Sequence, residues 1–259
     1  MWNLSNIGRI FYGISIAGIG FPTVYYKVFP YMLLPPQFLK PGNSLLTYIV
    51  GALLIMAGIV IVLLKKTSEV SLTLGSLFLL IFCFFFIPFM FSTNSNYKHL
   101  AEWENAEKVL SLAGGAFIIA GLYSAKNKNL NSRFWGKLIP FGAILFSIPI
   151  ISFGILHFQL AKDVATMVPS WIPFPLFWTY FAGTALVGSG IAIILKIRTG
   201  LVAALLGTMI FIWFITIHVP GVFSSSADDM NAQVTSAFLA LADSGIAFVI
   251  AGGAKKLAN

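Results

Sequence analysis

Three ionisable side chains stand within or at the ends of long apolar segments, where they could bind a ligand or transfer a proton. His157 belongs to the stretch GILHF (154–158), His218 stands two residues before Pro220, and Asp243 is flanked by small and apolar residues. Histidine changes its charge near neutral pH, and its ring both donates and accepts hydrogen bonds. A carboxylic acid can exchange protons with such a ring. These three residues are therefore candidates for ligand binding or proton relay.

The composition places these residues in a membrane. Hydrophobic residues make up 58% of the chain and charged residues only 9%, against roughly 25% charged residues in a soluble domain. The net charge of +8 would suggest nucleic-acid binding in a soluble protein, but here the cations flank apolar segments, as in membrane proteins. We therefore expect an integral membrane protein that contacts the lipid bilayer and binds no nucleic acid.

Eight apolar segments are long enough to cross a membrane, since a spanning helix needs about 20 residues. They cover residues 8–26, 45–64, 70–91, 107–125, 136–159, 175–195, 199–220 and 233–254. The first segment lacks a convincing cleavage site, so we expect a retained helix and not a cleaved signal peptide. The sequence predicts an all-α membrane protein with eight transmembrane helices.

The distribution of Lys and Arg predicts the orientation, because cytoplasmic loops carry an excess of both. A cytoplasmic N-terminus puts eleven of the sixteen Lys and Arg residues on the cytoplasmic side. We therefore expect a multi-pass protein of the inner (plasma) membrane with both termini in the cytoplasm. Four loops then face outward: 27–44, 92–106, 160–174 and 221–232.

The sequence matches itself when it is shifted by 132 residues. The shift aligns Thr47-Tyr48 with Thr179-Tyr180, Gly51 with Gly183, Gly58 with Gly190, Gly75 with Gly207 and Pro88 with Pro220. We therefore predict two parallel four-helix repeats, residues 1–125 and 136–259, joined by a polar cytoplasmic linker, 126–135. We also expect each helix to pack mainly within its own repeat.

The three candidate residues are not duplicated by the repeat. The first copy has approximately Thr23 at the position of His157, Phe86 at that of His218 and Leu112 at that of Asp243. A group that merely built the four-helix unit would recur in both copies. The second repeat is therefore expected to carry the functional residues.

The motifs around these residues resemble those of the DoxX-like membrane proteins. The similar elements are a GxxHF helix end, a Pro/aromatic outer segment, an aromatic helix start at Phe177 to Tyr180, and His218-Val219-Pro220. The resemblance covers residues 136–254 and reaches the first half only through the repeat. It implies a four-helix unit associated with redox complexes, with quinone as a candidate cofactor. The first copy lacks both histidines, so the resemblance implies a structural role for it.

The Pro/aromatic segment 167–177 connects the fifth helix to the sixth at the level of the two histidines. Indole rings favour the headgroup boundary, so we expect this segment to form a lid over a pocket. His157 and His218 should line that outward-facing pocket within about 10 Å of each other, with Asp243 deeper and Tyr180 as a polar neighbour. The expected lid residues are Met167, Pro169, Trp171, Pro173 and Trp178.

Three classes of function fit these residues. The first is an accessory or redox-associated subunit that binds a small hydrophobic ligand such as a quinone. The others are a non-catalytic subunit that docks a protein partner and a carrier for a small solute. The sequence lacks familiar catalytic motifs and a metal-ligand set, so an enzymatic role is left open and no metal is expected. Each histidine could instead be an interfacial residue bonded to a carbonyl, and Asp243 a neutral acid bonded to a neighbouring hydroxyl.

Overall fold

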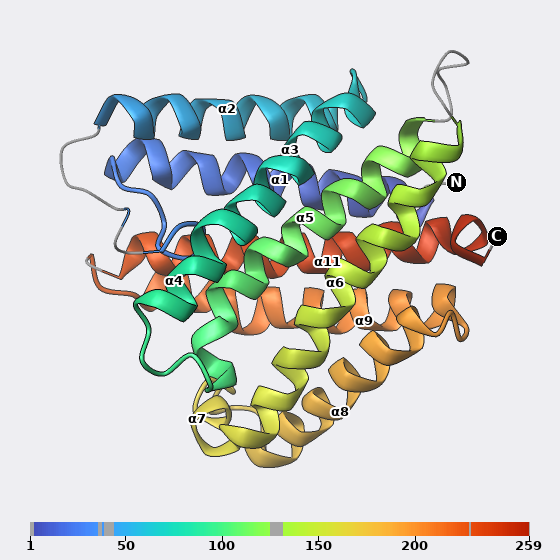
Figure 1. Ribbon diagram of the computed structural model, residues 1–259. Coiled ribbons are helices and arrows are strands. Elements are labelled where there is room, and N and C mark those ends of the chain that lie inside the picture. The colour runs from blue at the N-terminus through green and yellow to red at the C-terminus, as the bar shows by residue number, and fades with distance from the viewer. Residues whose placement is uncertain (1–2, 36–37, 39–43, 125–131, 228, 259) are drawn as a thin grey trace.

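The computed structural model describes the chain except residues 1–2, 36–37, 39–43, 125–131, 228 and 259 (Figure 1). Within these residues, eight helical segments are long and apolar enough to cross a membrane, which confirms the predicted fold class. They are α1 (Leu4–Tyr26), α2 (Ser44–Val62), α3 (Thr67–Ile81) with α4 (Ile87–Ser92), α5 (Glu104–Tyr123), α6 (Ser132–Gln159), α8 (Pro175–Ile194), α9 (Thr199–Trp213) with α10 (Val219–Ser224), and α11 (Met230–Ala258). The expected linker lies outside the described residues up to residue 131, and from Ser132 it belongs to α6.

The helix ends gather at two opposite faces of the bundle. The terminal face holds the start of α1, the loops 63–66 and 195–198, and the end of α11 (Figure 1). The loop face holds the connections 27–35, 93–99, 160–174 and 225–227, with the short helices η3 (Leu100–Trp103) and α7 (Ala161–Ala165). These two groups of connections are the ones that the charge distribution assigns to the cytoplasm and to the outside, respectively.

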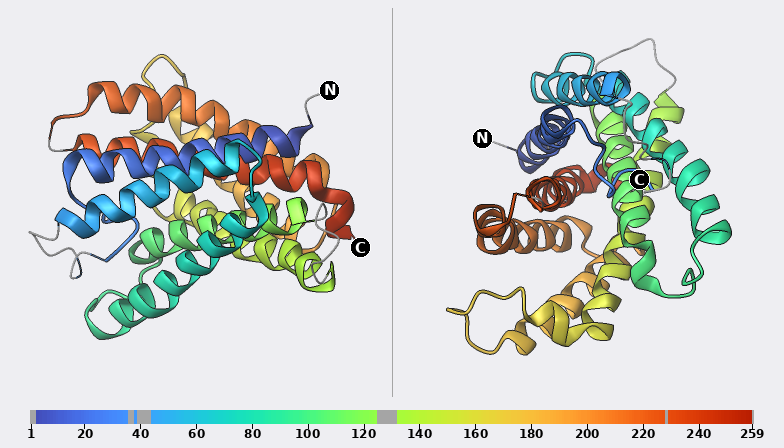
Figure 2. Two further views of the ribbon diagram at one scale, coloured as in Figure 1. Left: turned by 90° about the horizontal axis from the view of Figure 1, so that it is seen from above. Right: turned by 90° about the vertical axis from the view of Figure 1, so that its left-hand side faces the viewer.

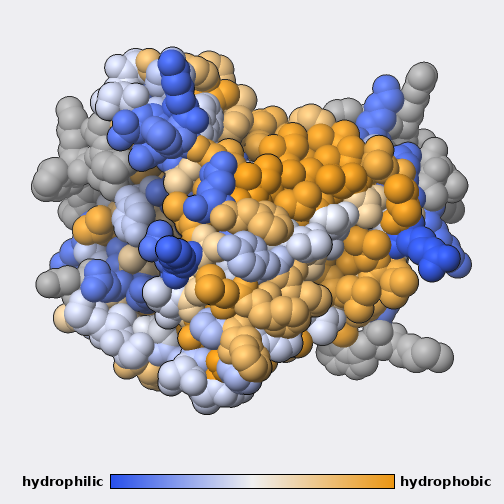
Figure 3. Space-filling view, turned by 90° about the horizontal axis from the view of Figure 1, so that it is seen from below, coloured by the Kyte–Doolittle hydropathy of each residue, from blue (hydrophilic) through white to orange (hydrophobic). Residues whose placement is uncertain are grey.

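An apolar band surrounds the bundle between the two faces. Figure 3 shows hydrophobic side chains across the middle of one side, with hydrophilic residues gathered toward both ends. Large exposed apolar side chains lie on the outermost helices, among them Leu53 of α2, Phe181 of α8, and Leu205 and Ile215 of the α9 segment. Because so large an apolar surface is unfavourable in water, the band is the lipid-contacting surface of an integral membrane protein.

The eight spans form two crossed layers of four helices. One layer contains α2, α1, α11 and α9 in this spatial order, and the other contains α3, α5, α6 and α8 (Figure 2). Each layer therefore combines two helices from residues 1–125 with two from residues 132–259. The most extensive contacts of α1 are with α11, and those of α5 are with α6. The expectation that each helix packs mainly within its own repeat is thus wrong for these four helices.

Glycines allow the close approach of the paired helices. A Cβ atom added to Gly245 would lie 2.7 Å from the Gly8 carbonyl oxygen, between α11 and α1. A Cβ atom added to Gly114 would lie 2.6 Å from the Gly142 carbonyl oxygen, between α5 and α6. Lipid offers no hydrophobic drive for helix association, so small residues decide which surfaces approach each other.

Two wide helical turns interrupt the third and seventh spans at corresponding positions. The π-helical segment η2 (Phe82–Phe86) lies just before Pro88, and η5 (Phe214–His218) lies just before Pro220. A proline ring clashes with the carbonyl four residues earlier and lacks an N–H, so the preceding turn widens. The Val219 N–H accordingly donates to the Phe214 carbonyl, five residues earlier. This turn makes His218 the last residue of η5.

Candidate functional site

A hydrogen bond between α5 and α11 lies at the centre of the candidate site. The Ser111 hydroxyl donates to Oδ1 of Asp243 over 2.5 Å. The two helices belong to different layers, so this bond connects the layers directly. The structure therefore gives Asp243 the hydroxyl partner that one interpretation of the sequence expected.

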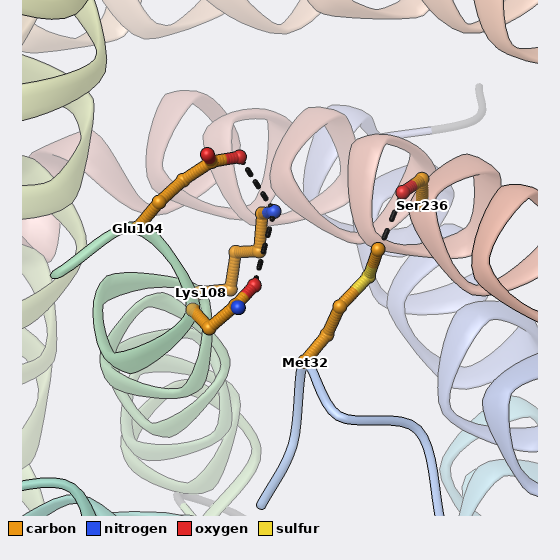
Figure 4. Close-up of polar contacts among 5 residues, drawn as sticks. Met32, Glu104, Lys108 and Ser236 are labelled. Carbon is orange, nitrogen blue, oxygen red and sulfur yellow. Dashed lines mark hydrogen bonds and ion pairs between the residues drawn. The ribbon is translucent and has the colours of Figure 1, made fainter. Parts of the chain in front are cut away.

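Lys108 brings a positive charge toward this carboxylate. It lies three residues before Ser111 on α5, about 4.5 Å closer to the loop face. Its Nζ donates to Oε1 of Glu104 over 2.6 Å and to Oδ1 of Asn105 over 3.4 Å (Figure 4). The Lys108 side chain is 16% exposed, whereas that of Glu104 is 49% exposed. Lys108 is thus a partly buried cation whose hydrogen-bond partners belong to its own helix.

His218 lies on a third helical segment, η5, within electrostatic range of the same lysine. The Lys108 charge is near enough to act on both His218 and Asp243. Within the described residues, the His218 imidazole makes no hydrogen bond, so its ring nitrogens have no partner in the protein. The wide turn η5 determines where this ring stands, because His218 is its last residue. Two of the three residues selected from the sequence, His218 and Asp243, therefore lie within electrostatic range of the same lysine.

Tyr12 extends the polar groups toward the centre of the bundle. Its side chain is fully buried on α1, and its hydroxyl donates to the Leu112 carbonyl over 2.7 Å. Tyr12 also lies within electrostatic reach of the Asp243 carboxylate. We call Tyr12, Lys108, Ser111, His218 and Asp243 the central polar cluster.

His157 has a different environment. On α6, its Nδ1 donates to the Phe153 carbonyl over 2.7 Å, one turn earlier in the same helix. Its ring stacks on Trp213 of α9, with ring centres 5.9 Å apart and planes 18° apart. This arrangement matches the interpretation of an interfacial histidine bonded to a carbonyl. His157 thus contacts α9, which precedes η5 and its His218 in the same span, and Lys108 is not among the partners of His157 in the described part of the chain.

The expected lid is exposed. Met167 is 64% exposed and Trp171 is 71% exposed, so both side chains project outward. Pro169 and Pro173 accept backbone and side-chain hydrogen bonds within the segment, the latter from Nε1 of Trp178 over 3.1 Å. The segment is therefore a connection on the loop face that is stabilised by hydrogen bonds within itself.

Tyr180 is also on the outer surface. Its side chain is 46% exposed and its ring stacks on Phe158, with ring centres 5.9 Å apart. The contact joins α8 to α6 and places Tyr180 among aromatic residues at the bundle surface. Tyr180 therefore does not belong to the central polar cluster, in which the Ser111 hydroxyl is the hydrogen-bond partner of Asp243.

Sequence reasoning missed three members of the central polar cluster, Tyr12, Lys108 and Ser111, and also Glu104, which binds Lys108. The spacing of Glu104 and Lys108 is that of a helical ion pair, which could have indicated an ordered lysine. An aspartate deep in a membrane segment also needs a polar partner, and this requirement could have drawn attention to Ser111 on α5. Nothing local indicated Tyr12, because its partner is 100 residues away.

No protein-family model matches the sequence, and no curated protein or solved structure is significantly similar to it. The resemblance to the DoxX-like proteins therefore stays a prediction. The functional argument depends on the chemistry of the central polar cluster.

Proposed function

We propose that this integral membrane protein binds a small, largely apolar ligand with hydrogen-bond acceptor oxygens, of the quinone class, at the loop-face end of the central polar cluster. In this proposal it is an accessory or redox-associated membrane subunit of the DoxX-like type. The observation that carries the proposal is that Lys108, which is held by Glu104 and Asn105, lies within electrostatic range of both His218 and Asp243.

The hydrogen-bonding capacity of the cluster supports such a ligand. A lysine ammonium has three N–H groups, and Glu104 and Asn105 accept only two of them from Lys108. The third N–H and the imidazole of His218 can donate to carbonyl oxygens. Asp243 and Ser111 lie deeper and can accept or return a proton. A bound quinone would supply the electron-carrying chemistry that these side chains lack.

Among the described residues, the first half has no counterpart of this cluster. The sequence counterparts of His218 and Asp243 in the first half are Phe86 and Leu112, and both are buried apolar residues. Leu112 is fully buried, so this counterpart position has no polar function. We therefore propose one ligand site per chain, in agreement with a structural role for the first copy.

The test is equilibrium binding of a short-chain ubiquinone analogue to the purified protein in detergent. Lys108→Met and His218→Phe should each weaken binding about tenfold or more, since each removes a charged or polar donor. Lys162→Met and His99→Phe are matched controls, because both native residues are exposed on the loop face. Equal affinity in the cluster variants and the controls would refute the proposal.

A second candidate is a carrier of protons or of a small polar solute. It is favoured by the depth of the cluster, because polar groups extend along α5 from Glu104 to Ser111, about 10 Å, and continue to Tyr12. In proteoliposomes with an internal pH dye, a carrier would show a flux that Asp243→Asn abolishes. Quinone binding without such a flux would support the first candidate.

A further inference from the structure

A separate cavity of about 810 Å³ opens at the terminal face, at the opposite end of the bundle from Lys108. The starts of α1 and α3 and the end of α11 line it. None of the central polar cluster lies among its lining residues in the described part of the chain. It is therefore a distinct place where a ligand could bind.

Two helix N-termini open into this cavity. α1 begins at Leu4, after Asn3 accepts a hydrogen bond from the Ser5 N–H over 3.3 Å, and α3 begins at Thr67. The first N–H groups of a helix have no partner within the helix and carry partial positive charge. Two such ends at one cavity make it favourable for an anion.

The side chains reinforce this preference. Lys66 and Lys255 line the cavity and are exposed, so both ammonium groups can reach a ligand. Thr67 also lines it, is only 4% exposed, and its Oγ1 has no hydrogen-bond partner among the described residues. A buried hydroxyl without a partner is costly, and an oxyanion would supply the missing acceptor.

Several other polar groups of the cavity are paired with one another. The Tyr123 hydroxyl donates to Oδ1 of Asn6 over 2.8 Å, which fixes the wall formed by α1. Glu69 is the one carboxylate among the described lining residues, and its Oε2 accepts from the Ser68 hydroxyl over 2.8 Å. The Glu69 charge opposes an anion, but two lysines and two helix N-termini outweigh it.

We propose that this cavity binds a phosphate group. Phosphate presents several acceptor oxygens to converging N–H, hydroxyl and ammonium donors, and this cavity offers all three kinds. The helix ends place it beside the headgroup region of a bilayer. The phosphate can therefore belong to an anionic lipid headgroup or to a soluble phosphate, and these two sources share the same chemistry.

The experiment is native mass spectrometry of the full chain released from detergent, with phosphatidylglycerol and phosphate-free diacylglycerol as probes. We expect phosphatidylglycerol to be retained and diacylglycerol to be lost. Lys66→Gln combined with Lys255→Gln should weaken retention about tenfold, and Thr67→Val should weaken it less. Lys65→Gln is the matched control, because Lys65 is exposed on the same loop and does not line the cavity. Glu69→Gln should strengthen retention.

Inorganic phosphate distinguishes the two sources. Retained phosphatidylglycerol that millimolar inorganic phosphate does not displace assigns the cavity to a lipid headgroup. Displacement, or phosphate binding with the same sensitivity to the lysine variants, assigns it to a soluble phosphate. Equal retention of both lipids without phosphate binding, or an equal loss in Lys65→Gln and the double variant, would overturn the proposal. The lysines concerned are exposed, so these variants are expected to fold.

Discussion

Ser111 and Asp243 are hydrogen-bonded to each other across the α5–α11 contact and are 132 residues apart in the sequence. The fourth helix of one expected repeat thus faces the fourth helix of the other. In the last helices the two halves match at an offset of 131 residues, as residues 116–121 and 247–252 show, so Asp243 aligns with Leu112 and Ser111 with Ala242. Leu112 and Ala242 are both fully buried apolar residues. The pair Ser111–Asp243 is therefore polar, whereas the pair that corresponds to it in the repeat is apolar.

Removing one partner of this bond should destabilise the protein. Ser111→Ala leaves Oδ1 of Asp243 without its donor, and we expect a loss of about 0.6 to 1.7 kcal/mol, the range for hydrogen bonds between membrane helices. The double variant Ser111→Ala with Asp243→Leu copies the apolar counterpart pair and should recover stability. Unfolding by SDS in mixed micelles measures both. A double variant less stable than Ser111→Ala alone would contradict this account.

Adding a methyl group at the α5–α6 crossing should separate the helices. In Gly114→Ala the new Cβ would lie 2.6 Å from the Gly142 carbonyl oxygen, and we expect a loss of about 1 to 3 kcal/mol. Gly188→Ala is the control, since a Cβ there meets nothing within 4 Å and alanine favours a helix. Similar thermal stability of the two variants in detergent would show that this crossing is not tightly packed.

Replacing Arg9 should loosen the end of α2. Arg9 is 3% exposed, its Nη1 donates to the Ile61 and Val62 carbonyls, and its guanidinium lies 5.5 Å from the centre of the Tyr123 ring. Arg9→Met leaves these helix-terminal carbonyls without their donor, and we expect a loss of about 1.5 to 3 kcal/mol. Arg9→Lys should recover little, because lysine lacks the planar fork. Lys65→Met, an exposed change nearby, should leave the unfolding transition unchanged.

The orientation can be tested with single cysteines. Cys83 is exposed on the third span, so the background is Cys83→Ser. Asp163→Cys on the loop face should react with an impermeant maleimide in intact cells, because the charge distribution places this face outside. Lys65→Cys on the terminal face should react only after permeabilisation. The reverse order of labelling would invert the predicted topology.

The sequence by itself determined the class of protein and the number of spans. Long apolar segments in so weakly charged a chain can satisfy their backbone groups in lipid only as helices, and the structure describes eight of them. The sequence also indicated His218 and Asp243, because an ionisable residue deep in an apolar segment is conspicuous. The internal repeat stays a prediction, and the corresponding π-helical turns before Pro88 and Pro220 support it.

Only the tertiary structure decided which helices are neighbours and which way the polar side chains point. Apolarity does not distinguish a lipid-facing surface from a helix-facing one, since lipid is as apolar as a leucine. Close glycine contacts selected α11 as the partner of α1 and α6 as the partner of α5. That pairing combined the two halves within each layer and brought Ser111 to Asp243. It also brought Lys108, a cation that the sequence alone assigned to the outer side, within electrostatic range of His218 and Asp243.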